Sequence, residues 1–271
     1  MRHLTAKQTA ATLKGHGLDS ANAAAFAFRD RARNTFYDWH VHPDHQLIFA
    51  LEGVTQIETA EARYLLPVGR AAWIPAGVRH RTAIADVDGT SLYFPRASVP
   101  AAGNRVRILA ADNLMREMLL HAMRWPRGLA ERNPLAVSFF RTLSLLCQTW
   151  LESELPLSLP GANHPALARA MDHALSHLGT MTLAAAIKRA GMSERTFRRV
   201  FRAETNMSWQ AWLAQARMLR AMTLLAEGRR VTDVAARVGY QSLSAFAKAF
   251  FLLTGENPAS YRQRTQAAAK A

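Results

Sequence analysis

Three histidines and a glutamine in the first third of the chain have the residue types and spacing of a metal site. One residue separates His40 from His42, so in an extended strand their side chains point to the same face. A partner strand carrying His80 would add a third imidazole, and Gln46 offers an amide oxygen. Neutral imidazole suits one divalent Zn, Ni, Co, Cu or Fe ion, whereas an uncharged Gln is a weak ligand. Alternatively, no metal binds and these side chains line an organic-ligand pocket, where His80 donates to an acidic group; His45 is interpreted as a surface or turn residue.

The residues around the histidines have the period of short β-strands. Apolar residues alternate or cluster in five runs, at 47–51, 54–58, 62–66, 71–74 and 91–94. Turn-forming residues such as Gly53 and Pro75-Ala76-Gly77 separate these runs. Several short strands at close, regular spacing predict a small β-barrel or sandwich.

The histidine spacing also matches two motifs of a known fold. The chain contains His40-x-His42-x3-Gln46-x6-Gly53, followed by Gly69-x5-Pro75-x-Gly77-x2-His80. Both runs resemble the motifs of the cupin barrel, H-x-H-x3-E-x6-G and G-x5-P-x-G-x2-H, with Gln46 in place of the usual Glu. The resemblance implies a cupin barrel over about residues 36–95, with His40, His42, Gln46 and His80 at the position of the cupin metal site.

Two copies of one helix-turn-helix pattern occupy residues 182–262. Each copy has a Thr that can cap a short helix, a glycine turn, a Ser cap and a second helix with two Phe four residues apart. The paired positions are Thr182 and Thr232, Gly191 and Gly239, Ser193 and Ser242, Phe197 and Phe246, and Phe201 and Phe250. Phe residues at this spacing share the buried face of a helix. The outward face carries Arg195, Arg198, Arg199 and Arg202 in the first copy, and Gln241, Ser244 and Lys248 in the second.

The distance between the copies suits two adjacent turns of DNA. Gly191 and Gly239 are 48 residues apart, and residues 209–226 have the pattern of one amphipathic helix. Such a helix is roughly 27 Å long, and it could hold two recognition helices about one DNA turn, roughly 34 Å, apart. Since Arg is the commonest reader of guanine, we expect the first copy to carry most of the sequence discrimination and Lys248 to contact phosphate. The alternative is an all-helical bundle with a solvated Arg face.

Three runs in this region resemble the DNA-binding domain of AraC/XylS-type transcription regulators. They are GMSERTFRRVF (191–201), VTDVAARVGYQS (231–242) and GENPASYR (255–262). The chain departs from the family pattern at Ala186-Ile187, where Leu-Ala is usual, and at Leu243, where Pro is frequent. A cupin followed by this domain is a familiar arrangement in the family. The resemblance implies a homodimeric regulator of double-stranded DNA controlled by a small molecule or metal, and it admits RNA polymerase as a further partner.

Catalysis is the alternative from another class of function. Cupins with bound metal serve as dioxygenases and isomerases, so the chain could be a metal-dependent cupin enzyme fused to a DNA-binding domain. Against this stand the missing Glu at Gln46 and the fused DNA-binding half. We therefore predict that the protein is not an enzyme.

Apolar residues at helical spacing connect the two halves of the chain. We predict helices at 113–125, 134–155 and 166–178, with a Pro- and Gly-containing linker between the last two. The first two helices either pack on the barrel or pair with those of a second chain, and the resemblance favours the dimer. The predicted domains are a cupin-like sensor and dimerisation domain at 1–155, a linker at 156–164 and the DNA-binding domain at 165–271. The fold class is α+β, with an N-terminal cupin β-barrel and packed helices, and a C-terminal all-α domain.

Charge and composition agree with a nucleic-acid partner. The 271-residue chain has a net charge of +14, and residues 165–271 contain 16 Lys and Arg against 6 Asp and Glu. A basic excess on one domain is the electrostatic footprint of phosphate binding. The single Cys147 lies in an apolar run, so we predict a buried thiol and no disulfide. Without a secretory or membrane-spanning pattern, we expect a cytoplasmic protein with no membrane partner.

Overall fold

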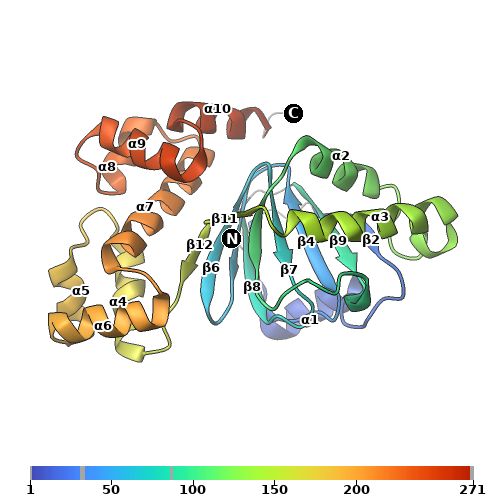
Figure 1. Ribbon diagram of the computed structural model, residues 1–271, viewed down its shortest axis with the longest axis horizontal. Coiled ribbons are helices and arrows are strands. Elements are labelled where there is room, and N and C mark those ends of the chain that lie inside the picture. The colour runs from blue at the N-terminus through green and yellow to red at the C-terminus, as the bar shows by residue number, and fades with distance from the viewer. Residues whose placement is uncertain (1, 31–33, 86–87, 269–271) are drawn as a thin grey trace. The chain divides into compact units, whose positions relative to one another are not determined.

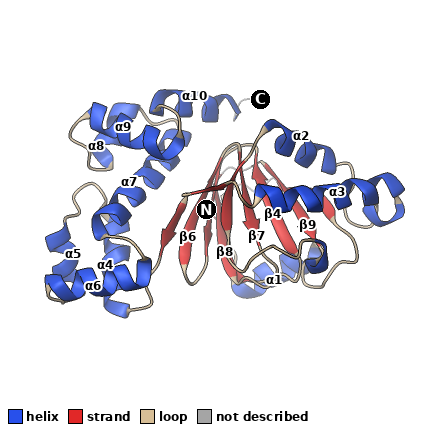
Figure 2. Ribbon diagram, in the orientation of Figure 1, coloured by secondary structure: helices blue, strands red, loops and turns tan. Residues whose placement is uncertain are grey.

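The computed structural model describes residues 2–30, 34–85 and 88–268. The chain divides into two compact units, one of residues 1–59 with 64–158 and the other of residues 60–63 with 159–271. Strands dominate the first unit and helices dominate the second (Figure 2). The α+β class predicted from the sequence is confirmed. No helix in the described part of the chain is long and apolar enough to cross a membrane.

The strands of the described residues form two six-stranded sheets, and most of these strands belong to the first unit (Figure 1). In spatial order, the first sheet consists of β1 (Arg2–His3), β3 (Thr35–His40), β8 (His80–Ala85), β5 (Val54–Glu58), β6 (Ala62–Pro67) and β12 (Ser158–Pro160). The second sheet consists of β11 (Glu154–Leu155), β10 (Arg107–Ala110), β7 (Arg70–Ile74), β4 (His45–Ala50), β9 (Gly89–Phe94) and β2 (Phe26–Asp30). β1 pairs in parallel with β3, and all pairs of the second sheet are antiparallel.

Alternation along β4 gives the second sheet two different faces. Leu47 lies opposite Leu92 of β9 and Trp73 of β7, and all three side chains are fully buried. They belong to one hydrophobic cluster with residues of α2 (Asn113–Ala122) and α3 (Pro134–Trp150). The neighbouring residues Gln46 and Ile48 point to the opposite face and line a cavity. Helices α2 and α3 therefore pack on one face of this sheet, and the cavity lies against its other face.

The structure adds elements that the first 34 residues did not predict clearly. Helix α1 (Ala6–Gly15) begins at a capping box, in which Thr5 and Gln8 each accept a hydrogen bond from the other's backbone N–H. Strand β2 then pairs with β9, with Phe26 opposite Tyr93. The predicted helices at 113–125 and 134–155 are shorter than expected and end at Ala122 and Trp150. The chain after Trp150 turns into strands β11 and β12, so the segment predicted as a plain linker contains strand residues.

The second unit consists of seven helices among its described residues. They are α4 (Pro165–Ser176), α5 (Leu183–Ala190), α6 (Glu194–Thr205), α7 (Trp209–Ala226), α8 (Val231–Arg237), α9 (Leu243–Thr254) and α10 (Pro258–Ala268). Helices α5 and α6 form the first helix-turn-helix unit, and α8 and α9 form the second. Fully buried Phe197 and Phe201 pack edge-on against Trp209 in the first, and Phe250 packs edge-on against Tyr261 in the second.

The predicted helix caps are correct at three of four positions. Thr182, Ser193 and Ser242 each accept a hydrogen bond from the backbone N–H three residues later. The prediction for Thr232 is wrong, because α8 begins at Val231 and Thr232 lies inside its first turn. Arg230 occupies the N-cap position without a side-chain hydrogen bond to the helix. The second copy therefore begins its first helix two residues earlier than a cap at Thr232 would give.

Candidate functional sites

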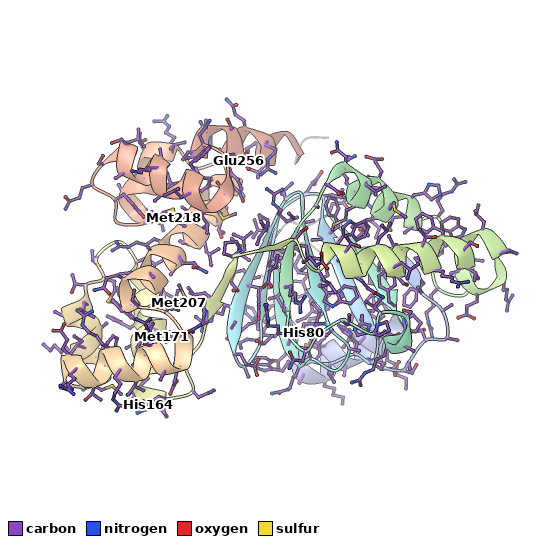
Figure 3. The ribbon with its side chains drawn as sticks, in the orientation of Figure 1. His80, His164, Met171, Met207, Met218 and Glu256 are labelled. Carbon is purple, nitrogen blue, oxygen red and sulfur yellow. The ribbon has the colours of Figure 1, made fainter. Side chains whose placement is uncertain are left out.

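The structure brings the three predicted histidines together in the first unit. His40 at the end of β3 lies opposite His80 at the start of β8, and their ring centroids are 4.2 Å apart. The His42 ring lies 5.1 Å from the His80 ring and 6.4 Å from the His40 ring. His80 lies among the strands of this unit, where it is fully buried (Figure 3). The strand pairing expected from the sequence therefore exists, although it does not by itself test metal binding.

Each of the three rings is held in one tautomer by a backbone carbonyl. Nδ1 of His40, His42 and His80 lies 2.6–2.9 Å from the carbonyl oxygens of Asp38, Asp44 and Val78, respectively. A carbonyl can only accept, so Nδ1 donates and Nε2 of each neutral ring carries the lone pair. Burial lowers the pKa of His42 to about 4, and it also lowers the pKa values of His40 and His80. All three rings are therefore neutral near pH 7, the form in which imidazole binds metals.

This tautomer corrects the expectation that His80 donates to an acidic ligand. Its Nδ1–H is already used by Val78, so Nε2 of the neutral ring accepts instead. That atom is buried and has no hydrogen-bond partner among the described residues. A buried polar atom without a partner is costly, so a ligand that meets it should bring a hydrogen-bond donor or a cation.

Gln46 meets His42 in an arrangement that requires a particular amide orientation. Its Oε1 lies 3.1 Å from the His42 Nε2, and its Nε2 lies 3.2 Å from the Ser91 hydroxyl. The His42 Nε2 and the Gln46 Oε1 are both acceptors, so they cannot bond to each other in this orientation. If the Gln46 amide turns by 180°, its NH2 donates to His42 and its oxygen accepts from the Ser91 hydroxyl. A cation between the two acceptors would satisfy them as well. However, no group of three or more His, Cys, Asp or Glu side chains within residues 2–30, 34–85 and 88–268 is arranged to hold a metal ion.

The interpretation of His45 as a surface or turn residue is wrong. β4 begins at His45, two residues earlier than predicted, and the side chain is buried with its ring stacked 5.2 Å from Trp73. Its Nδ1 accepts from the Ala76 N–H at 2.9 Å, and its Nε2 lies 3.1 Å from the Arg96 carbonyl oxygen. Both ring nitrogens therefore have backbone partners, and His45 connects β4 to two loops.

A cavity of about 250 Å³ lies between the two sheets, next to the histidines. Its walls include His40, Thr55 and Thr82 from the first sheet, and Gln46 and Ser91 from the second. The remaining described lining residues are Thr12, Leu13, His16, Leu18, Phe28, Arg29, Tyr37, Ile48, Ile84, Gly89 and Tyr93. No acidic side chain is among these residues.

Aromatic rings form one side of the cavity, and most of them were missed in the sequence. The Phe28 ring stacks on Tyr93 at 5.8 Å and on His16 at 5.3 Å, with nearly parallel planes in both pairs. Arg29, at the same wall, forms an ion pair with Asp88. The alternation Phe26-Ala27-Phe28 was the available signal for β2, but only its pairing with β9 places Phe28 at the cavity.

The predicted DNA-binding side chains lie on exposed faces of the second unit. Arg195, Arg198, Arg199 and Arg202 are exposed on α6, whose Phe197 and Phe201 are buried. Arg198 donates to Glu194 one turn earlier, with Nε–O and Nη2–O distances of 2.8 and 2.7 Å. Gln241, Ser244 and Lys248 are exposed at and before α9, and the hydroxyls of Ser244 and Ser242 lie 2.7 Å apart. All seven predicted side chains are therefore exposed, and their contact with DNA stays a prediction.

Comparisons with known proteins agree with both halves of the chain. The model of the AraC-like ligand binding domain matches residues 22–187, and that of a helix-turn-helix domain matches residues 186–264. The HTH-type transcriptional regulator NimR of Escherichia coli (strain K12) is 30% identical over 263 residues, which cover 93% of this chain and 92% of NimR. The HTH-type transcriptional activator RhaR of Yersinia pseudotuberculosis (serotype O:1b, strain IP 31758) is 38% identical over 72 residues, covering 26% of this chain and 25% of RhaR.

Among solved structures, the DNA-binding domain of AdpA in complex with a target DNA has 36% sequence identity with this chain. The match covers 38% of this chain and 94% of that domain, with a TM-score of 0.36.

A ligand-binding domain followed by a helix-turn-helix domain defines a class of DNA-binding transcription regulators. This chain belongs to the AraC family of those regulators. NimR, which matches nearly the whole length of the chain, is a transcription regulator, in agreement with the prediction that this chain is not an enzyme.

Proposed function

We propose that this regulator binds a two-part DNA site through α6 and α9, and that a small organic molecule in the cavity of the first unit controls that binding. The observation that carries the proposal is the cavity itself, which combines aromatic walls with polar side chains such as His40, Thr55, Thr82 and Ser91. Ligand sites commonly have this composition, with apolar walls and a few polar groups that fix orientation. A ligand can shift DNA binding only if it binds one arrangement of the chain more tightly than another.

The lining suggests the chemistry of the effector. A cavity of about 250 Å³ lies below the roughly 300–1,000 Å³ of sites for drug-sized ligands, so the effector is small. The parallel rings of His16, Phe28 and Tyr93 suit a planar molecule. His40 lines the cavity and donates from Nδ1 to the Asp38 carbonyl, so its Nε2 can accept a hydrogen bond from a hydroxyl or amino group on the ligand. We expect a single aromatic ring with a hydrogen-bond donor.

A cavity-filling variant tests this site. We would measure the melting temperature of the full chain with a panel of hydroxylated and amino-substituted single-ring aromatic compounds. Thr55 on β5 lines the cavity, whereas its neighbour Gln56 is exposed. Compounds that stabilise the wild type should not stabilise Thr55→Phe, but they should stabilise Gln56→Phe. Equal stabilisation of both variants would place the binding elsewhere and refute the proposed site.

A divalent transition metal is a second candidate effector; His40, His42 and His80, which this structure does not arrange as a metal site, would have to move closer together to hold it with Gln46. The fixed tautomers support it, because each Nε2 lone pair is left free of a backbone partner and His80 Nε2 has none among the described residues. Bound metal would act as a Lewis acid and could recruit an anionic ligand. Elemental analysis of protein purified without an affinity tag, beside a His40→Ala/His42→Ala variant, tests this. Near-stoichiometric metal that the variant lacks supports it, and no metal in either protein removes it.

We also propose that the regulator works as a homodimer in the cytoplasm. Besides its buried face, α3 exposes Leu135 and Leu145, which are 65% and 60% accessible, and α2 exposes Leu114 at 53%. Exposed apolar residues gathered on neighbouring helices are typical of an interface. Light scattering should give a dimer mass for the wild type and a monomer mass for Leu135→Glu/Leu145→Glu. A dimer mass for that variant would exclude this face. A contact with RNA polymerase stays a prediction.

A further inference from the structure

Two glycines bring the loop before the first helix-turn-helix unit into contact with the turn of the second unit. Gly179 lies in the loop between α4 and α5, before the first unit, and Gly239 is the turn glycine of the second unit. A Cβ built on Gly239 would lie 2.7 Å from the Gly179 carbonyl oxygen, and a Cβ on Gly179 would lie 2.8 Å from the Arg237 carbonyl oxygen. Separations below about 3 Å are closer than real Cβ contacts. Only glycine at both positions permits this approach.

Arg217 of α7 holds the same loop. Its Nε donates to the Leu178 carbonyl at 3.0 Å, and its Nη2 donates to the Met181 carbonyl at 3.3 Å. The Nη2 atom would also lie 3.1 Å from a Cβ on Gly239, so the guanidinium lies beside the glycine contact. Met218, which follows Arg217 on α7, is labelled in Figure 3 and shows where on the helix Arg217 lies. A charge-assisted hydrogen bond to a carbonyl is stronger than a neutral one, so Arg217 fixes the loop to α7.

Helix α7 alone does not determine the orientation of the two units. A continuous helix fixes the distance along its axis, while rotation around that axis depends on how each unit packs against it. The glycine contact and Arg217 add a connection to one side of the helix, where the units meet. We infer that Arg217 with Gly179 and Gly239 sets the orientation of α9 relative to α6, and thereby the half-site spacing that the protein accepts in DNA. Arg217 is a positioning residue in this arrangement and does not itself contact DNA.

The two turn glycines offer a matched comparison. Gly191 and Gly239 hold equivalent places in the two units, and both have left-handed backbones, with φ of 65° and 88°. A Cβ on Gly191 would meet nothing within 4 Å, whereas one on Gly239 would meet the Gly179 backbone. Alanine at either site adds similar backbone strain. Only alanine at Gly239 should disturb the contact between the units.

The test compares binding to DNA sites of different spacing. A two-part site is first selected from random DNA with the wild-type full chain, and its spacing is then changed by one or two base pairs in each direction. Tethered engagement of two sites raises affinity over a single half-site by on the order of 100-fold when the geometry fits, and it is lost when the geometry does not. For Arg217→Met and Gly239→Ala we expect the ratio of two-part to half-site affinity to fall about tenfold. We also expect the affinity of these variants to depend less on the spacing between the half-sites. Affinity for the α6 half-site alone should stay unchanged, and Gly191→Ala should keep the wild-type spacing preference.

Three outcomes decide the inference, which rests on α6 and α9 as the recognition helices. An unchanged spacing preference in Arg217→Met would overturn it. If Arg217→Met loses as much affinity for the half-site as for the two-part site, general unfolding explains the result and Arg217→Lys, which keeps the charge, decides. An equal loss of both affinities in Arg217→Lys would overturn the inference, whereas a larger loss for the two-part site would support it. A wild-type protein that selects only one half-site would instead refute the proposed role of α9, independently of the variants.

Discussion

Replacing Arg198 with alanine is the most direct test of how α6 recognises DNA. The side chain is exposed, and it is bound to Glu194 through Nε and Nη2. A guanidinium has five N–H donors in one plane. Glu194 occupies two of them, which leaves a neighbouring pair on Nη1 and Nη2 at the outer end of the group. That pair matches the O6 and N7 acceptors of guanine in the major groove. Glu194 thus holds Arg198 in an orientation that can read a guanine.

The magnitude follows from these contacts. A bidentate Arg–guanine contact discriminates by roughly 1–3 kcal/mol, which corresponds to about a 5- to 150-fold change in affinity. Both side chains of the ion pair are about half exposed, so its loss costs the folded domain only about 0.3–0.5 kcal/mol. Arg198→Ala should therefore weaken binding at one or two base pairs without unfolding the domain. Glu194→Ala should reduce specificity less, and it should raise non-specific affinity because a negative charge near the phosphates is removed.

Fluorescence anisotropy with a set of singly substituted operators separates the possibilities. The wild type should lose affinity when one particular guanine is replaced, and Arg198→Ala should be indifferent to that replacement. The salt dependence is a second readout, because a residue that neutralises a phosphate contributes about one unit to the slope of log K against log salt. If the variant binds all operators more weakly by the same factor, with a slope lower by about one, Arg198 contacts phosphate and the assignment is refuted.

Three further predictions concern stability. Phe250→Ala should lower the free energy of unfolding by about 3–5 kcal/mol because the ring is fully buried. Phe251→Ala should lower it by less than about 0.5 kcal/mol because that ring is 55% exposed. Urea unfolding measures both, and similar losses in the two variants would contradict the packing. Ser193→Ala should lower the free energy of unfolding by about 1 kcal/mol because it removes a helix cap. Thr232→Ala should leave it nearly unchanged in the same assay, and a larger loss for Thr232→Ala than for Ser193→Ala would show that Thr232 is a cap. Burial raises the pKa of the Cys147 thiol to about 12, so iodoacetamide should not label the native protein at pH 8, and fast labelling would show an accessible thiol. The unfolded thiol loses its proton first, so the contribution of Cys147 to stability should be constant below about pH 9 and fall between about pH 9 and 12, by at most about 1.4 kcal/mol per pH unit.

Local spacing was enough to predict the helix-turn-helix units and the meeting of the histidines. Ser193, Phe197 and Phe201 lie within one motif, and the order of elements fixes what each contacts. His40 and His80 lie at the ends of strands that pair directly, so their approach could be expected. In the helix-turn-helix units the contacting residues are close in sequence, and for the histidines the two motifs specify which residues meet.

The cavity wall and the contact between the two helix-turn-helix units could not be predicted in the same way. Phe28 reaches the cavity because β2 pairs with β9, more than 60 residues later, and no local pattern encodes that pairing. His45 has the neighbours of a turn residue, but its partners Trp73 and Arg96 come from distant segments. Arg217 lies on an amphipathic helix, where an arginine usually faces water. Only the folded chain shows that it donates to carbonyl groups about 40 residues earlier.

The edges of the two sheets bear on how the first unit can be handled. The outermost strands of both sheets, β1, β12, β11 and β2, all come from outside residues 35–110, and three of them have only two or three residues. Short edge strands protect a sheet from pairing with other chains. A fragment cut to residues 35–110 would keep the histidine motifs but uncover β9, whose six residues are all buried. Such a fragment should aggregate through its open edges, so the residues on both sides of the motifs protect the sheets from pairing edge to edge with other chains.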